Sequence, residues 1–151
     1  AGRAVHGFSM GSSGALKFAI KYPDMFCAAM GGGGGAIDLE KTKDPWILNI
    51  LKNNLASDPK LVQQNNTYHF LQKNHQKVRE NGTRFLLLCG DADSWLKSAI
   101  TFQAALRKKS ISCELVTVPK VGHNLRAIFQ AEGNRSALFQ AKVFQETSER
   151  K

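Results

Sequence analysis

The sequence predicts an α/β protein with a mostly parallel sheet and flanking helices, and three observations lead to that class. Residues 84–89 form a near-continuous apolar run, which is typical of a parallel strand buried on both faces. A helical pattern over 96–109 follows it, with Ile100, Ala104 and Leu106 among its apolar positions, and a strand pattern over 113–118 comes next. Together they predict a right-handed βαβ unit. A chain of 151 residues can bury one core, so we expect one domain.

The N-terminal part of the chain adds two strands around a helix. Residues 3–8 and 26–30 are the strand candidates. Residues 11–22 have a helical pattern that ends at Pro23, because the proline ring disfavours helical backbone in the residue before it. The expected apolar side of this helix comprises Leu16, Phe18, Ala19 and Ile20.

Five consecutive glycines, residues 31–35, follow the second strand. Gly31, Gly33 and Ala36 match a phosphate-binding glycine pattern, but no Lys-Ser/Thr pair follows them. We therefore expect a strand exit at which the backbone passes close to another group, with a phosphate-binding loop as the alternative.

Residues 44–81 have a polar, helical pattern. Asp44-Pro45 and Asp58-Pro59 each resemble a helix cap followed by proline at the first helical position. We expect 36–82 to be a helical insert or a substrate-facing segment of the domain, in which Trp46 and Trp95 either line an acyl or sugar pocket or belong to the core. A last helix is expected from Leu125 onward. His69 and His75 are expected to be surface or packing residues.

Composition excludes several function classes. The net charge is +9, but the basic residues are scattered and no aromatic residues interleave with the one cluster at 107–109, so we expect no nucleic-acid partner. No run of eighteen apolar residues occurs, so we expect no membrane span. The three cysteines are Cys27, Cys89 and Cys113, and we expect them to be buried thiols. CxxC and HExxH patterns are absent, so we expect no metal and no cofactor.

Three chemically useful residue types each follow a predicted strand. Ser9 follows the first strand, Asp91 and Asp93 follow the long apolar strand, and His123 follows the last one. The carboxyl ends of parallel strands meet at one edge of the sheet, so these side chains are expected to lie close together. Serine, acid and histidine are the components of a nucleophilic triad. We favour Asp93 as the acid because a loop position further past the strand has more room to reach back, and Asp91 stays an alternative.

The sequence around the serine is Gly7-Phe-Ser9-Met10-Gly11. In a nucleophile elbow the serine occupies a strained turn between a strand and a helix. Side chains two places before and two places after it are expected to collide, which explains both glycines. The Met10 backbone N–H is then placed to donate to a developing oxyanion.

The stretch GFSMGSSGALKFAIKYPDMF resembles the elbow and following helix of an esterase family with the α/β-hydrolase fold. That family includes feruloyl and acetyl-xylan esterases, enterochelin esterases, S-formylglutathione hydrolases and mycolyltransferases. LLLCGDADSWL and VPKVGHNL are similar to its acid and histidine loops. The resemblance implies that Ser9 is the nucleophile, Asp93 the acid and His123 the base.

The resemblance also implies what the whole domain contains. Members of the fold have strands and one oxyanion donor before the elbow, so we expect this chain to be the C-terminal part of such a domain, with its N-terminal strands missing. An unpaired first strand, with its outer edge and both faces uncovered, would favour self-association. The compartment stays open between secretion or the periplasm and the cytoplasm.

The expected function is hydrolysis of carboxylic esters, including acyl groups on carbohydrates, through an acyl-enzyme. The expected substrates are small-molecule or carbohydrate esters. An acyltransferase, a peptidase of the same fold and a non-catalytic hydrolase-like domain are the alternatives.

Overall fold

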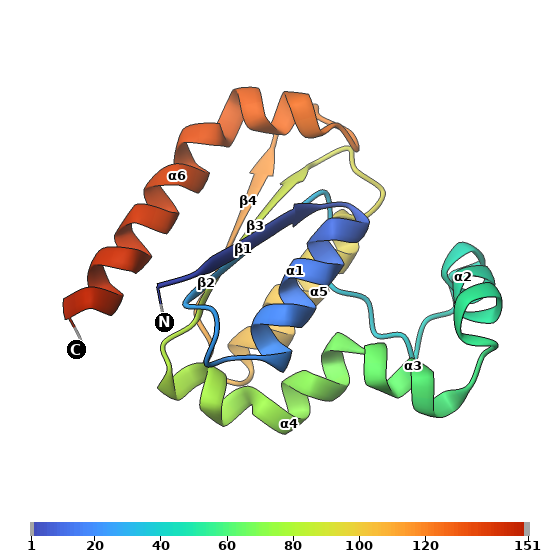
Figure 1. Cartoon of the computed structure of the whole chain (residues 1–151). Coiled ribbons are helices and arrows are strands. Elements are labelled where there is room, and N and C mark those ends of the chain that lie inside the picture. The colour runs from blue at the N-terminus through green and yellow to red at the C-terminus, as the bar shows by residue number, and fades with distance from the viewer. Residues whose placement is uncertain (1, 150–151) are drawn as a thin grey trace.

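The computed structural model describes residues 2–149, which form one parallel sheet of strand order β1-β2-β3-β4 with helices on both faces (Figure 1). The predicted α/β class and parallel sheet are confirmed. The strands are β1 (Ala4–Phe8), β2 (Ala28–Gly32), β3 (Arg84–Gly90) and β4 (Cys113–Val118). The helices are α1 (Met10–Lys21), α2 (Pro45–Leu55), α3 (Pro59–Asn65), α4 (Thr67–Glu80), α5 (Leu96–Arg107) and α6 (Leu125–Glu149).

Strand β3 lies between β2 and β4 and is buried on both faces, which explains its unbroken apolar run. Phe85 and Leu87 pack in a cluster with residues of α1, α4 and α5. Leu86 and Leu88 point to the other face and pack with Ile128 of α6. The sheet is therefore the middle of three layers, with α1 and α5 on one side and α6 on the other (Figure 1).

The edge strand β1 pairs with β2 and with no other strand among residues 2–149. The expectation that both its faces lack partners is wrong. Val5 packs against the cluster that contains α1, and Phe8 packs against the cluster that contains Ile128 of α6. The helices that follow β1 and β4 in sequence supply these contacts.

Both predicted proline-started helices are confirmed. The Asp44 carboxylate accepts hydrogen bonds from the backbone N–H groups of Trp46 and Ile47 at the start of α2. Asp58 caps α3 in the same way. These carboxylates satisfy N–H groups that have no partner inside the helix.

Some predicted buried faces are wrong by part of a turn. Phe18 of α1 and Ile100 of α5 are about half exposed, and Ala104 is exposed. In α5 the buried positions are Ala99, Phe102 and Leu106. The helical period predicts a helix, but the side that faces inward depends on where the sheet and the other helices lie.

The predicted burial of Cys27, Cys89 and Cys113 is confirmed, and all three are free thiols. Among residues 2–149, no helix has the length and apolar character needed to cross a membrane.

Candidate active site

Ser9 lies in the turn between β1 and α1, in a backbone conformation that L-residues rarely adopt. Its φ is 57° and its ψ is −120°. The turn is fixed by a hydrogen bond of 2.8 Å from the Ser9 N–H to the Gly32 carbonyl oxygen at the end of β2. A strained serine between a strand and a helix is the geometry of a nucleophile elbow.

The two glycines of the elbow differ in what they make possible. A Cβ on Gly7 would overlap the backbone carbonyl of Gly11. A Cβ on Gly11 would meet no atom within 4 Å. The predicted collision is therefore confirmed at Gly7 and wrong at Gly11. The space beside Gly7 is filled by the backbone of Gly11, whereas a side chain on Gly11 would point into open space.

Three of the side chains singled out from the sequence form one hydrogen-bonded chain. Ser9 Oγ lies 2.9 Å from Nε2 of His123, and His123 Nδ1 lies 2.8 Å from Oδ2 of Asp93. The Asp93 side chain is fully buried. Its second oxygen accepts a hydrogen bond of 2.9 Å from the Trp95 N–H. Buried carboxylates need such partners, and both oxygens of Asp93 have one.

Asp91 has a different place. Its side chain is exposed, and Oδ1 accepts a hydrogen bond of 2.7 Å from the Lys120 N–H. The Asp91 N–H donates to the Val118 carbonyl oxygen, and the Ala92 N–H donates to that of Val121. These bonds join the loop after β3 to the loop after β4. Asp91 therefore holds the two loops together, while Asp93 contacts the histidine.

The His123 ring is held from two further sides. Its centroid lies 4.8 Å from that of Phe8, at the end of β1. Gly33 has a φ of 65°, and a Cβ there would lie 2.9 Å from His123 Cε1. The expected close passage of the glycine run is thus confirmed: Gly31 and Gly32 end β2, and the next glycine leaves room for the imidazole.

Met10 is the first residue of α1, so its backbone N–H has no partner inside the helix. It follows Ser9 directly, at the positive end of the helix dipole. Backbone N–H groups at a helix N-terminus favour negative charge on a bound oxygen.

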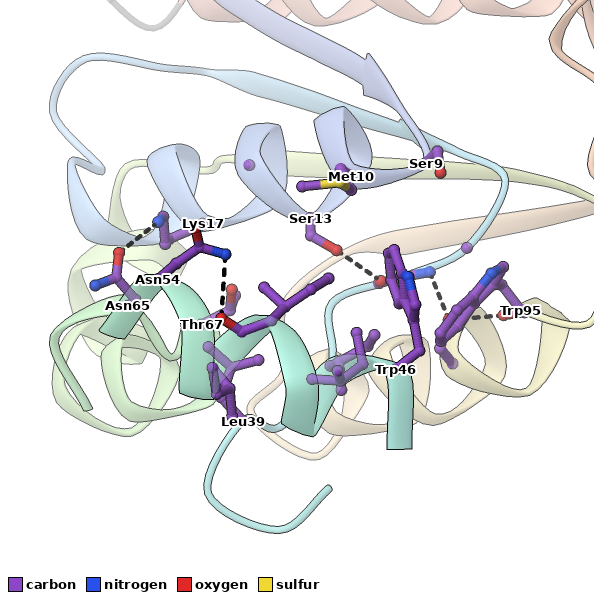
Figure 2. A pocket seen from close by; sticks show the side chains of 18 of the residues that line it. Ser9, Met10, Ser13, Lys17, Leu39, Trp46, Asn54, Asn65, Thr67 and Trp95 are labelled. Atoms are coloured by element: carbon purple, nitrogen blue, oxygen red, sulfur yellow. Dashed lines mark hydrogen bonds between the residues drawn. The ribbon is translucent and has the colours of Figure 1, made fainter. Parts of the chain in front are cut away.

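A cavity of about 360 Å³ begins at Ser9 and runs beside α1 (Figure 2). Trp46 and Trp95 both line it, and their ring centroids are 6.0 Å apart. In the segment expected to face substrate, residues of the loop after β2 and of α2 line the cavity, and so do Asn65 and Thr67. The rest of α4 packs against α1 through Leu71 and Val78. Lys17 and Asn65 also line the cavity and were not identified from the sequence.

The signal for Lys17 was present in the sequence but was ambiguous. Met10, Ser13, Gly14 and Lys17 are spaced i, i+3, i+4 and i+7, so they share one face of α1. A helix face with small and polar residues usually indicates solvent exposure, and nothing local distinguishes a solvated face from the wall of a pocket. Among residues 2–149, no group of three or more metal-binding side chains comes together.

Comparison with models of known protein families shows to which family the chain belongs. Residues 2–146 match the model of the prolyl oligopeptidase family. The chain belongs to the prolyl oligopeptidase family. This membership assigns it to the serine hydrolases at the level of the family. No curated protein sequence matches the chain.

Solved structures agree with the fold of the prolyl oligopeptidase family and with the esterase resemblance. A ferulic acid esterase aligns with a TM-score of 0.67 and 24% identity, over 94% of this chain and 52% of that one. An S-formylglutathione hydrolase from Agrobacterium tumefaciens aligns with a TM-score of 0.69 and 23% identity, over 92% of this chain and 48% of that one. A puromycin hydrolase aligns with a TM-score of 0.63 and 18% identity, over 94% of this chain and 22% of that one. The fold is therefore the α/β-hydrolase fold, and the chain spans about half the length of the two esterase-type structures.

Proposed function

We propose that this protein hydrolyses carboxylic esters, with Ser9 as the nucleophile, His123 as the general base and Asp93 as the residue that orients the imidazole. The observation that carries the proposal is the unbroken chain of contacts from Asp93 through His123 to Ser9, 2.8 and 2.9 Å long. Membership of a serine hydrolase family supports the same class of reaction.

The reaction proceeds in two halves. Ser9 Oγ attacks the carbonyl carbon of the ester while His123 Nε2 accepts its proton. The tetrahedral intermediate collapses, the C–O bond to the alcohol breaks, and the imidazolium returns the proton to the departing alcohol oxygen. Water then attacks the acyl-enzyme with the same base, which releases the carboxylic acid and restores Ser9. In sum, ester and water give acid and alcohol.

Asp93 and the Met10 N–H stabilise charges that develop during the reaction. With Nδ1 protonated, the imidazole donates to the Asp93 carboxylate, which fixes the productive tautomer and stabilises the imidazolium. The Met10 N–H donates to the oxyanion of the tetrahedral intermediate. Each such donor typically contributes on the order of 10²–10³ in rate.

Hydrolysis of peptide or amide bonds is the second candidate, and the family match favours it. The same residues serve both reactions because the bond that is cleaved depends on the pocket and the leaving group. A p-nitrophenyl ester and the p-nitroanilide of the same acyl group distinguish them. Because an activated ester is intrinsically more reactive than an anilide, the anilide decides: we expect no hydrolysis of the anilide above that of the Ser9→Ala variant, and clear Ser9-dependent hydrolysis of it would favour the peptidase.

Labelling with a fluorophosphonate tests the nucleophile. We expect the native protein and the Ser94→Ala variant to be labelled and Ser9→Ala to remain unlabelled, because Ser9 is the one serine among residues 2–149 whose hydroxyl is hydrogen-bonded to a histidine ring. Ser94 is an exposed serine next to Asp93 and makes a matched control. Labelling that survives Ser9→Ala would refute the assignment.

A further inference from the structure

The cavity beside α1 lies on one side of Ser9. Its lining includes Ser9 and Met10 but neither His123 nor Asp93. The leaving alcohol of an ester must lie within hydrogen-bond reach of His123 Nε2, since that nitrogen donates the proton. The acyl part of the substrate therefore extends away from His123, and this cavity is the space available to it. This step rests on the proposed ester hydrolysis.

The walls of the cavity suit an apolar chain. Trp46, Trp95, Ile47 and Leu51 line it near α2. Figure 2 shows the two indole rings below the start of α1, on the Ser9 side of the cavity. The cavity follows α1 to Lys17, eight residues beyond Ser9. At 1.5 Å per residue, that is about 12 Å along the helix axis, the length of an extended chain of about ten carbon atoms.

A cation lies at the far end of this apolar space. Lys17 Nζ donates a hydrogen bond of 3.1 Å to Asn65 Oδ1, and Figure 2 shows this pair at the end opposite Ser9. The ammonium also lies 5.9 Å from the Phe18 ring centroid. Within residues 2–149, no carboxylate forms an ion pair with Lys17. The charge is therefore held by neutral groups.

The surroundings of Lys17 favour an anion there. Burial lowers the pKa of its ammonium, and the nearby Lys21 lowers it further. Both effects mean that, in the part of the chain that the structure describes, no nearby negative charge balances the positive charge of this ammonium. A carboxylate bound beside it would replace lost hydration and oppose the repulsion from Lys21. An apolar chain end would leave the Lys17 ammonium without a negative partner.

We propose that the cavity selects esters whose acyl chain is apolar and ends in a carboxylate, with Lys17 as the residue that binds the terminal carboxylate. The substrates are half-esters of dicarboxylic acids of about ten carbons. Hydrolysis adds water across the ester bond and releases the alcohol and the free dicarboxylic acid. Lys17 is a specificity residue and takes no part in the bond-breaking steps.

A pair of probes of equal length tests the selection. The p-nitrophenyl half-ester of sebacic acid carries the terminal carboxylate, and p-nitrophenyl decanoate lacks it. We expect kcat/KM to be about tenfold higher for the half-ester, mainly through a lower KM. Lys17→Met is expected to bring the kcat/KM values for the two probes close to each other, while Lys17→Arg retains the preference for the half-ester. Equal loss on both probes, or no preference in the native protein, would overturn the proposal.

Lys21→Met is the matched control, because Lys21 carries the same charge one helical turn further and does not line the cavity. We expect it to keep the preference for the half-ester. Loss of the preference in Lys21→Met as large as in Lys17→Met would indicate a general effect of positive charge and would refute binding by Lys17.

A binding measurement separates this inference from the proposed function. The chain contains two tryptophans, and both line the cavity, so intrinsic fluorescence reports its occupancy. Monomethyl sebacate is expected to change the fluorescence of the Ser9→Ala variant at about tenfold lower concentration than methyl decanoate, and Lys17→Met is expected to remove the difference. Absence of this difference would overturn the inference even if Ser9 is labelled. Selective binding without labelling of Ser9 would instead refute ester hydrolysis and leave the carboxylate site standing.

Discussion

Gly90 and Val121 lie so close that a Cβ on Gly90 would overlap the Val121 carbonyl group. Gly90 ends β3, and Val121 belongs to the loop after β4 that carries His123. The Val121 carbonyl oxygen accepts a hydrogen bond from the Ala92 N–H, 3.0 Å long. The approach of the two loops, and with it the contact between Asp93 and His123, depends on the absence of a side chain at residue 90.

Gly90→Ala is therefore expected to displace the histidine loop. We expect a loss of about a hundredfold in kcat/KM, because displacements of about 1 Å in a catalytic group have effects of that size. The free energy of unfolding is expected to fall by about 1–3 kcal/mol. Gly122→Ala is the control, since the nearest atom to its Cβ would be the Ala92 carbonyl oxygen at 3.9 Å. Esterase assays and urea denaturation measure both effects, and a fully active Gly90→Ala protein would contradict the explanation.

The two elbow glycines are expected to respond differently to alanine. Gly7→Ala cannot keep the native turn, because its methyl group would overlap Gly11, so we expect loss of activity and of stability. Gly11→Ala has open space and lies in the first turn of α1, where alanine is favoured over glycine by up to about 1 kcal/mol. Thermal unfolding and fluorophosphonate labelling of the two variants check this. Equal damage from both would show that the turn needs glycine at residue 11 for another reason.

Asp93→Asn and Asp91→Asn distinguish the two acids. The amide at residue 93 cannot stabilise the imidazolium, and we expect kcat to fall by a factor on the order of 10³–10⁴ with little change in KM. At residue 91 an amide oxygen still accepts the hydrogen bond from Lys120, so kcat is expected to stay within about threefold. The kcat values for one p-nitrophenyl ester decide between them. A larger loss of kcat in Asp91→Asn than in Asp93→Asn would show that Asp91, and not Asp93, stabilises the imidazolium.

The buried thiols predict a dependence on alkaline pH. Burial, together with the nearby Asp93 carboxylate, raises the pKa of Cys89 to about 12, and burial raises the pKa of Cys113 to about 12. Both thiols stay neutral when the chain is folded, whereas in the unfolded chain they ionise near pH 8.5, about the ordinary value. The stability that the neutral thiols contribute is complete below about pH 8.5 and is lost as the pH rises from there toward 12.

Alkylation measures this difference. We expect iodoacetamide at about pH 8.5 to modify Cys89 and Cys113 slowly in the folded protein and quickly in urea, because the thiolate is the reactive form. Mass spectrometry of the peptides quantifies each site. Fast modification of Cys89 in the folded protein would show that its thiol is not held in its neutral form.

Much of the fold was predictable from local patterns. The apolar run of β3 indicated a strand covered on both faces, and Asp44-Pro45 and Asp58-Pro59 indicated where α2 and α3 begin. These features depend on neighbouring residues in the chain: the continuous apolar run of a strand covered on both faces, the capping of free N–H groups and the fixed φ of proline. The sequence also indicated that Ser9 and His123 follow strands, and parallel strands bring such residues to one edge of the sheet.

Other features depended on atoms far away in the sequence. Phe18 and Ile100 fit the helical period as well as their buried neighbours do, and only the position of the sheet decides which side of each helix is buried. These errors have one cause, because a periodic pattern specifies the type of an element but not its neighbours.

The sequence by itself determined the class of the protein, the order of its elements and the three residue types that a hydrolase needs. Tertiary structure alone decided that Asp93 reaches the imidazole while Asp91 binds the backbone of Lys120, because that choice depends on how two loops thirty residues apart pair with each other. It also placed Lys17 at the end of the cavity that starts at Ser9. Contacts between distant segments are set by the register of parallel strands and by side-chain volume, and no local pattern encodes either.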